Sequence, residues 1–383
     1  MAGGNPSGCR VRATVGNPPG DDRKDLRSVD MTRVGLAGFG SSGRGIHAPL
    51  LQQAAMTIAA VSTSDPSRAD QVRQEVPEAQ VVADLDALLT VAGLDLIVLA
   101  TPSGLHAAQA RRCIDAGIAV VVDKPLATDS AQGLAVVEAA RAAGVALTVF
   151  QNRRFDAEHV AVRETVASGL LGEVFRHEFR WERWRPTPKD RWRENATAAE
   201  GGGILLDLHS HMIDAAVDLF GPIDTVYAEV AARTTAAEDD AFLACRHLSG
   251  VVSHLSATSV AAAPGPRVRV LGLGGAFVLN AFEGDGGGIY PDLADADAAQ
   301  CGWVYATAGR TPVTRPAGGQ VDFYRAVKRA LGSQDPAGAM PVDPYDAVHT
   351  LAVIDAARAS AAHQRVIQVR TPGRREGQPG QPS

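Results

Sequence analysis

Between residues 33 and 150, short apolar segments alternate with helical ones, and this alternation constrains the fold more than any other feature. The apolar segments are nearly continuous hydrophobic runs, which is typical of strands buried on both faces of a sheet. Helix signals separate them, such as Asp65 before Pro66 as an N-cap and Gly144 as a helix end. The pattern predicts a doubly wound parallel sheet covered by helices. The expected strands are Arg33–Ala37, Thr57–Ser62, Leu94–Ala100, Ile118–Val122 and Ala146–Phe150, and the expected helices are Ile46–Ala55, one starting at Asp65, Asp84–Ala92, Leu105–Ala116 and Ser130–Ala143.

After residue 150 the order of the elements changes, because strand-like segments follow one another without helices between them. Such grouping predicts a mixed or antiparallel sheet in a second domain. Residues 284–320, rich in Gly, Ala and Asp, give no readable pattern. The expected strands are Val174–Trp184, Thr225–Ala232, Ala241–His247, Val251–Thr258, Arg267–Leu271 and Gly274–Asn280, and the expected helices are His159–Ser168, Ile204–Phe220, Asp322–Ala330 and Asp343–Arg358.

The chain of 383 residues is therefore expected to hold two domains, over residues 31–152 and 153–371, with a tail at each end. Residues 1–30 and 372–383 contain too few apolar side chains to offset the entropy of ordering, so we predict that both are disordered. Residues 1–30 also lack the apolar core of a secretory signal. Met31 stands directly before the first strand, and we expect it to be the natural start.

Composition excludes several classes of protein. The chain has 37 basic and 43 acidic residues, a net charge of −6, which argues against binding to nucleic acid or to an anionic membrane. No apolar run reaches the roughly 18 residues of a membrane helix. The cysteines form no CxxC pair, which disfavours a disulfide scaffold or cysteine-rich zinc site and fits a reducing cytoplasm. They are Cys9, Cys113, Cys245 and Cys301.

A glycine-rich turn with the pattern GxGxxG follows the first strand and precedes a helix. In that context the pattern predicts a dinucleotide-binding turn. The first glycine permits the turn, the second lets backbone N–H groups approach a pyrophosphate, and the third lets helix and strand pack closely. The expected cofactor contacts in this turn are Gly38, Phe39, Gly40, Ser42 and Gly43.

The choice between NAD and NADP depends on the end of the second strand, where an acidic residue would bind the ribose hydroxyls of NAD. This position holds small neutral residues, Ser62, Thr63 and Ser64, with Arg68 one helical turn further. Hydroxyls and an arginine suit a 2′-phosphate, so NADP is favoured. Asp65 as the ribose acid would favour NAD instead, although an N-cap explains Asp65 more simply, and Arg68 could equally be a solvated surface charge.

Three further motifs accompany the glycine-rich turn. They are the loop from Thr101-Pro102 to His106, the tripeptide Asp123-Lys124-Pro125, and the segment 202–214, which holds Asp207, His211 and Asp214. With Gln151–Asp156 after the last parallel strand, these motifs resemble the glucose–fructose oxidoreductase / inositol dehydrogenase (Gfo/Idh/MocA) family over roughly residues 33–370. The resemblance implies a Rossmann domain followed by a domain with a large, mostly antiparallel open sheet, which binds substrate and mediates oligomerisation.

The resemblance also implies roles for individual residues. Lys124 corresponds to the lysine that touches cofactor and substrate, although this chain has Asp123 where the family has glutamate. Asp207 and His211 correspond to the family's substrate-binding aspartate and general base. An imidazole suits this chemistry because its unperturbed pKa of about 6.5 lies near working pH. Thr101, Pro102 and His106 match the loop near the nicotinamide.

Neighbouring side chains are less clearly assigned. Asn152 lies at the carboxyl end of a parallel strand, where ligands bind in this fold, so we include it among the cofactor contacts. Arg154 is predicted to contact substrate, with a surface salt bridge as the alternative. Asp214 shares the helix face of Asp207 and is expected to be structural, paired with a base from another element. His209 stands where the family commonly has glycine, so its role stays open. A metal pair with His211 is not supported, because no carboxylate–histidine cluster with zinc spacing accompanies them.

Tryptophans and arginines interleave in residues 180–193, a composition that can bind single-stranded nucleic acid. Acidic residues dilute this charge, so we expect instead a strand and loop at the mouth of the substrate cleft or at a subunit interface. The tryptophans are Trp181, Trp184 and Trp192.

The sequence thus predicts a cytoplasmic NAD(P)-dependent oxidoreductase acting on a hydroxyl of a sugar, inositol, sugar acid or related polyol, without a metal. By resemblance, a homodimer or homotetramer is expected. Two alternatives stay open. They are a redox-neutral glycosidase that uses NAD transiently and a regulatory protein that binds a dinucleotide without turnover.

Overall fold

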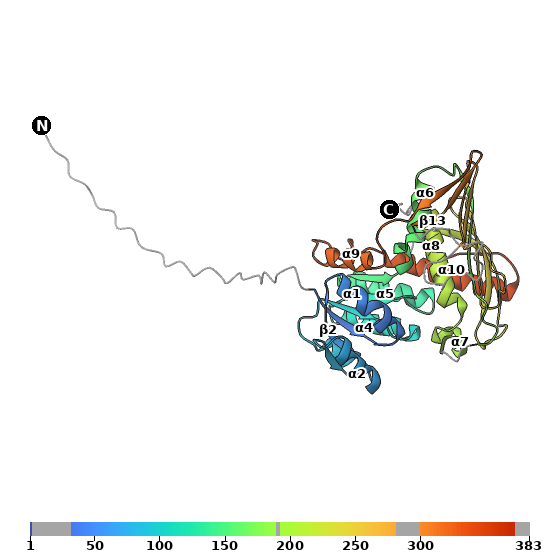
Figure 1. The fold of residues 1–383 in the computed structure, drawn as a ribbon. Coiled ribbons are helices and arrows are strands. Elements are labelled where there is room, and N and C mark those ends of the chain that lie inside the picture. Colours follow the sequence, from blue (N-terminus) through green and yellow to red (C-terminus); the bar gives the residue numbers. More distant parts are fainter. Residues whose placement is uncertain (2–31, 189–191, 281–298, 372–383) are drawn as a thin grey trace. The chain divides into compact units, whose positions relative to one another are not determined.

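The computed structural model describes Met1 and residues 32–188, 192–280 and 299–371. The predictions for the two tails and for Met31 as the start fall outside these residues. The fold is of the α/β class and contains two sheets (Figure 1).

The first sheet is parallel, with six described strands in the order β3-β2-β1-β4-β5-β6. This is the doubly wound order, and it brings the carboxyl ends of β1 and β4 together at the point where the strand order reverses. All five predicted strands are present, and the sixth, β3, has only three residues, too few to show a pattern. The strands are β1 (Arg33–Ala37), β2 (Thr57–Ser62), β3 (Gln80–Val82), β4 (Leu96–Leu99), β5 (Ala119–Asp123) and β6 (Leu147–Phe150).

Two helices of this domain begin or end at residues that the sequence marks, whereas the predicted Ile46–Ala55 begins earlier, at Gly43, and the predicted Asp84–Ala92 ends at Leu89. Asp65 caps α2 by accepting hydrogen bonds from the backbone N–H groups of Ser67 and Arg68, as predicted. Gly144 ends α5 in the left-handed conformation, with φ of +64°. The helices are η1 (Gly43–His47), α1 (Ala48–Gln53), α2 (Pro66–Glu75), α3 (Leu85–Leu89), η2 (Ser103–Leu105), α4 (His106–Asp115) and α5 (Ser130–Ala143).

The second sheet has nine strands within the described residues, in the order β14-β13-β12-β11-β7-β10-β9-β8-β15. Its pairings are antiparallel except that of β7 with β10. Strands β13 and β14 lie in the stretch that showed no pattern, because they form an edge hairpin whose side chains do not alternate between buried and exposed. The strands are β7 (Val174–Glu182), β8 (Ile223–Ala231), β9 (Asp240–His247), β10 (Val252–Thr258), β11 (Val268–Gly272), β12 (Ala276–Leu279), β13 (Gln300–Ala306), β14 (Gly309–Thr314) and β15 (Ile367–Gln368).

Helices from the second half of the chain connect the two sheets. Helix α10 packs on β8 and α8 of the second domain and also on α5 of the first, and α9 packs on α1 (Figure 1). The predicted helix at Ile204 begins with a π-helical turn, η5, directly after Gly203 (φ of +90°) and Ile204. The helices that follow β6 are η3 (Asn152–Phe155), α6 (Ala157–Ala167), α7 (Trp192–Asn195), η4 (Ala198–Glu200), η5 (Leu205–His209), α8 (Ser210–Phe220), α9 (Val321–Leu331) and α10 (Pro344–His363).

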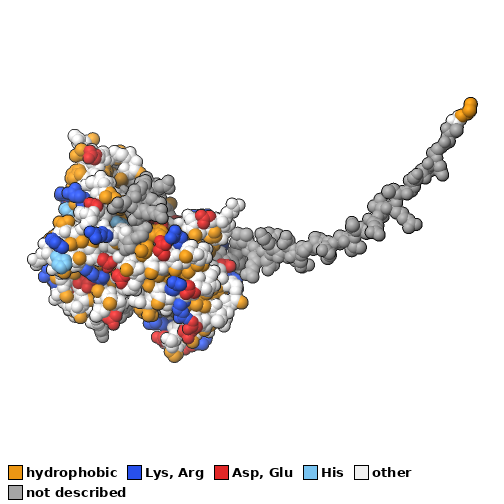
Figure 2. All heavy atoms as spheres, turned by 180° about the vertical axis from the view of Figure 1, so that it is seen from behind, with side chains coloured by type: hydrophobic (Ala, Val, Ile, Leu, Met, Phe, Trp, Pro, Cys, Tyr) orange, Lys and Arg blue, Asp and Glu red, His pale blue; other side chains and the backbone are white. Residues whose placement is uncertain are grey.

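The surface mixes both signs of charge. On the face drawn in Figure 2, basic and acidic side chains are interspersed with apolar ones. Among the residues with described coordinates, no helix combines the length and the apolar character needed to cross a membrane.

Three histidines lie in the core of the second domain. His177 Nδ1 and His247 Nε2 both lie within hydrogen-bond distance of Ser253 Oγ, at 3.2 and 2.8 Å. His209 Nε2 lies 3.3 Å from the carbonyl oxygen of Leu255 on β10. Burial lowers the pKa of His177 to about 3 and those of His209 and His247 to about 4, so all three rings are neutral at pH 7.

We expect the free energy of unfolding to fall as the pH drops from 6.5 toward 4. The unfolded chain binds protons at these histidines below pH 6.5 while the folded chain does not, so each residue contributes a slope of up to about 1.4 kcal/mol per pH unit. Urea unfolding at a series of pH values measures this slope. His247→Asn should reduce the slope by the contribution of one histidine, up to about 1.4 kcal/mol per pH unit. An unchanged slope in this variant would contradict the account.

Candidate functional site

The glycine-rich turn connects β1 to η1, and its three glycines meet different surroundings. A Cβ atom on Gly38, which has φ of +91°, would lie 2.7 Å from the carbonyl oxygen of Ala100. One on Gly43 would lie 2.1 Å from the carbonyl oxygen of Gly38. At Gly40 the nearest atom to such a Cβ is Arg68 Nη1, at 3.9 Å. Tight packing thus explains why Gly38 and Gly43 have no side chain, whereas there is open space beside Gly40.

That space is a hollow of about 390 Å³ beside the turn. Two arginines line it, and one of them, Arg44, is held by Glu75 through a bond of 2.9 Å from Nε. Exposed backbone and guanidinium groups of this kind fit the phosphates of a dinucleotide. The lining residues are Phe39, Gly40, Ser41, Arg44, Gly45, Arg68, Gln71 and Glu75.

The end of β2 places the predicted ribose-recognition residues beside the glycine-rich turn, and one of them, Arg68, lines the hollow. Ser62 is buried, and its carbonyl oxygen accepts a hydrogen bond from Gly38 N. Thr63 Oγ1 accepts one from Asp65 N at 3.3 Å. The Asp65 carboxylate caps α2 and lies 3.5 Å from Arg68 Nε, so its oxygens already have partners. Arg68 is half exposed and is the cation nearest to Gly40.

Asp123 links the glycine-rich turn to the lysine loop at the carboxyl end of β5. Ser42 Oγ donates a hydrogen bond of 2.6 Å to Asp123 Oδ2, and Lys124 N donates one of 2.8 Å to Oδ1. His47 Nε2 lies 3.4 Å from Oδ2. Burial would raise the pKa of Asp123, but the contacts with His47 and Ser42 outweigh it and lower this pKa well below its ordinary value. The carboxylate is therefore charged and fixes both loops.

Behind Asp123 lies a buried pair that the sequence did not reveal. Tyr324 of α9 lies with its hydroxyl 2.6 Å from His47 Nδ1, and both side chains are fully buried. Burial raises the pKa of Tyr324 well above its usual value, so the phenol keeps its proton beside Nδ1. The other ring nitrogen, Nε2, faces Asp123. The pair is separated by 277 residues, and no local pattern signals it.

His106 joins two of the predicted motifs. Its Nδ1 lies 2.7 Å from the carbonyl oxygen of Pro125, and its Nε2 lies 2.9 Å from that of Thr101. The ring is buried, and burial lowers its pKa. His106 thus holds the Thr101-Pro102 loop against the Lys124-Pro125 loop, so that both meet at the carboxyl ends of β4 and β5.

Lys124 and Asp207 bring the two domains together. Lys124 Nζ donates hydrogen bonds to the backbone carbonyl oxygen of Asp207, at 2.7 Å, and to its Oδ1, at 3.1 Å. The lysine side chain is 13% exposed and the aspartate side chain 35% exposed. The ammonium is thus largely withdrawn from solvent while its partner is still accessible.

His211 lies one helical turn after Asp207, at the start of α8. Its ring is buried and stacks on Trp181 of β7, with 5.9 Å between ring centroids. Burial lowers the pKa of His211 well below its ordinary value, and the charges of Lys124 and Arg153 lower it further. Within the described part of the chain, Nδ1 has no hydrogen-bond partner. A neutral imidazole with a free nitrogen can accept a proton.

The remaining predicted residues lie around this centre. Asn152 Nδ2 donates to Gln320 Oε1 at 3.0 Å, and Gln320 Nε2 donates to Asp156 Oδ1 at 2.7 Å. His209 packs against β10, as described above. Of the tryptophans in the interleaved segment, Trp181 contacts His211, whereas Trp184 is half exposed. Across the described ranges, no group of three or more His, Cys, Asp or Glu residues could hold a metal ion.

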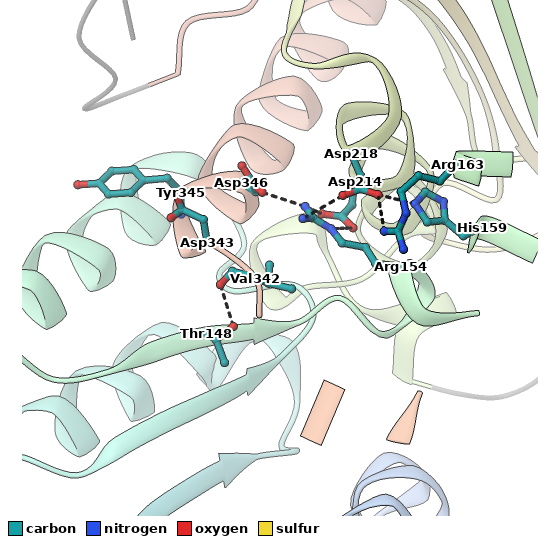
Figure 3. Close-up of polar contacts among 10 residues, drawn as sticks. All are labelled: Thr148, Arg154, His159, Arg163, Asp214, Asp218, Val342, Asp343, Tyr345 and Asp346. Carbon is teal, nitrogen blue, oxygen red and sulfur yellow. Dashed lines mark hydrogen bonds and ion pairs between the residues drawn. The ribbon is translucent and has the colours of Figure 1, made fainter. Parts of the chain in front are cut away.

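Arg154 lies among carboxylates on two helices (Figure 3). Its guanidinium contacts Asp214 and Asp218 of α8 and Asp346 of α10. The pairing of Asp214 with a base from another element agrees with the sequence prediction. The substrate contact predicted for Arg154 stays a prediction. The salt bridges that Arg154 forms are buried, in contrast to the surface salt bridge given as the alternative.

Comparison with known proteins assigns both halves of the chain to described families. Residues 32–151 match an oxidoreductase family with an NAD-binding Rossmann fold, and residues 159–278 match the GFO/IDH/MocA C-terminal domain. The scyllo-inositol 2-dehydrogenase (NADP(+)) IolW of Bacillus subtilis is 29% identical over 358 residues, which cover 90% of this chain and 98% of IolW. The uncharacterized oxidoreductase YdgJ of Escherichia coli is 31% identical over 350 residues, covering 88% and 99%.

Solved structures show the same arrangement. The Bacillus subtilis protein YvaA superposes with a TM-score of 0.78 at 28% identity, covering 90% of this chain and all of that one. Both domains are therefore shared in their order and topology.

We predict that Tyr324→Phe lowers the free energy of unfolding by about 1–3 kcal/mol, because it leaves the buried Nδ1 of His47 without its hydrogen-bond partner. Tyr345→Phe is the matched control, since the Tyr345 hydroxyl donates to Glu138 at the partly exposed start of α10. Urea unfolding of both variants measures the difference. An equal loss in the two would show that the Tyr324–His47 contact has no special weight.

Proposed function

The chain belongs to the GFO/IDH/MocA family of oxidoreductases, and from that premise we propose the reaction and the residues that perform it. The reaction is hydride transfer between a nicotinamide dinucleotide and a hydroxyl-bearing carbon of a sugar, inositol or related polyol. The observation that carries the proposal is the meeting of Lys124, Asp207 and His211 at the carboxyl end of β5, beside a turn with a free cradle at Gly40.

Lys124 is proposed to orient and polarise the substrate oxygen. Its ammonium is held by Asp207 in a largely buried position, so its charge acts through little water. A fixed positive charge beside a reacting hydroxyl stabilises the alkoxide that develops as the C–H bond is broken. Asp207 sets the position of the ammonium. Its side chain is also accessible enough to accept a hydrogen bond from a second substrate hydroxyl.

His211 is proposed to take the hydroxyl proton in oxidation and to return it in reduction. Its depressed pKa keeps the ring neutral at pH 7, which is the form that a general base needs. A bound nicotinamide would supply the hydride acceptor or donor. Dinucleotide contacts are proposed for the residues of the glycine-rich turn, for Thr101, Pro102 and His106, and for Asn152.

NADP is the proposed cofactor, since Arg68 stands beside Gly40 and the strand end carries hydroxyls in place of a free acid. The printed name of IolW specifies NADP(+), which supports the same choice. The second domain is proposed to mediate assembly into a homodimer or homotetramer.

His211→Asn is expected to lower kcat by about 10²- to 10⁴-fold, because it removes the proton acceptor. Dinucleotide affinity should be unchanged. His209→Asn, the same change two residues earlier, should keep most of its turnover, because His209 faces the sheet. Nicotinamide absorbance with a panel of sugars and inositols measures both.

The pH profile provides a further check on His211. Since its folded pKa lies below 6.5, the acid limb of kcat/KM should fall below that pH. Wild-type turnover in His211→Asn would contradict the assignment. Sugar cleavage without net reduction, with a dinucleotide that never exchanges, would identify the glycosidase alternative.

Arg68→Ala is expected to weaken NADP binding by about 10- to 100-fold, since a hydrogen bond to a charged group contributes about 1.5–3 kcal/mol. NAD binding should change little. Arg73→Ala is the matched control, because Arg73 lies on the same helix but pairs with Asp70 at the surface. Fluorescence titration with both reduced dinucleotides measures the effect, and equal weakening for NAD and NADP would exclude a role in 2′-phosphate recognition.

A further inference from the structure

We propose that Arg154 is a positioning residue for the catalytic helix α8, and that it sets the orientation of His211 through Asp214. The inference rests on the proposed function insofar as His211 is the general base. It assigns Arg154 an action through α8 in place of the substrate contact that its position in the sequence suggested.

The contacts of Arg154 occupy its whole guanidinium group. Nε donates to Asp214 Oδ2 at 2.9 Å, and one terminal nitrogen donates to Asp214 Oδ1 at 2.6 Å and to Asp346 Oδ2 at 3.1 Å. The other terminal nitrogen lies 3.5 Å from Asp218 Oδ1. All three nitrogens therefore face protein carboxylates, and the side chain is 11% exposed. This leaves little of the group for a substrate.

The fork on Asp214 restrains the rotation of α8. Two parallel N–H···O bonds fix a carboxylate in the plane of the guanidinium, which a single point charge cannot do. Asp214 lies three residues after His211, so the two side chains are neighbours on one helix. Asp218 lies one turn further along. A restraint at these two positions holds the first turn of α8 in a fixed orientation.

The other end of the restraint lies where the first domain passes into the second. Arg154 belongs to η3, directly after β6, and Thr148 of β6 donates a hydrogen bond of 2.9 Å to the carbonyl oxygen of Val342 (Figure 3). That segment leads into α10, which carries Asp346. Arg154 therefore ties β6, the catalytic helix and α10 to one point, close to the carboxyl ends of the parallel strands.

The charges make this arrangement sensitive to the loss of one partner. Burial would lower the pKa of Arg154, but the charges of Asp214, Asp346 and Asp218 outweigh it and raise it. Asp218 Oδ2 also lies 2.6 Å from His159 Nε2, within hydrogen-bond distance, and 3.6 Å from a terminal nitrogen of Arg163. Among the described residues, Arg154 is the cation that contacts Asp214 directly, so its removal would leave Asp214 as a buried carboxylate without that partner. Removing one member of a buried pair is far more disruptive than replacing both.

The test is a double-mutant cycle of Arg154→Met and Asp214→Leu, because an apolar pair can replace a buried ion pair. Each single variant should lose about 10²-fold in kcat, as expected for a displaced catalytic group, with little change in substrate KM. The double variant should be at least as active as the better single one. Arg154→Lys should fall between wild type and Arg154→Met, since lysine keeps the charge but not the fork.

A second readout needs no substrate. It is the NMR resonance of a ring carbon of His211, which is assigned by its loss in His211→Asn. This resonance should shift in Arg154→Met and return toward its wild-type position in the double variant. Arg163→Met is the matched control, because Arg163 is 41% exposed and contacts Asp218 alone among the acids of this network. It should leave the signal in place.

One set of results would overturn the proposal and identify a substrate contact. In that set the losses of kcat in the two single variants add up in the double variant, the substrate KM rises, and the His211 signal does not move. An unmoved signal with unchanged activity would overturn the proposal as well. If His211→Asn keeps wild-type turnover, the proposed function fails, and the His211 signal in Arg154→Met still decides whether Arg154 positions the helix.

Discussion

The hydrogen-bonded contact between Lys124 and Asp207 is the interaction on which the candidate site depends. It joins the end of β5 in the dinucleotide-binding domain to the helix that carries His211 in the second domain. The ammonium and the carboxylate lie 83 residues apart in the sequence, and the ammonium is largely withdrawn from solvent. A largely buried ammonium without its carboxylate would be unfavourable, so the contact fixes the geometry of both elements.

Two sets of buried contacts hold the loop that carries Lys124. Tyr324 holds His47 beside Asp123, and Asp123 in turn accepts hydrogen bonds from Ser42 of the glycine-rich turn and from the backbone of Lys124. His106 holds the loops that begin at Thr101 and Lys124 together. The lysine is thereby tied to the same framework that shapes the cradle at Gly40, so the proposed cofactor and substrate contacts share one support.

The sequence predicts well what local patterns encode. The five longer parallel strands, the Asp65 cap and the glycine-rich turn all depend on neighbouring residues, and all are present. β3 is too short to show a pattern, and the β13–β14 hairpin lacks the alternation that marks a half-buried strand. The contacts of His47 with Tyr324 and of Asn152 with Gln320 join residues more than 160 positions apart, so no spacing could signal them. Arg154 shows the same limit, since its partners lie on helices far along the chain.

A structure of the protein with a dinucleotide and a polyol bound tests the central claim most directly. The account predicts that one substrate oxygen lies within hydrogen-bond reach, about 2.6–3.2 Å, of both Lys124 Nζ and the His211 ring. It also predicts that the Lys124–Asp207 contact persists in the complex. A substrate bound with its hydroxyls away from both residues, or a Lys124 that has left Asp207 for another partner, would contradict it.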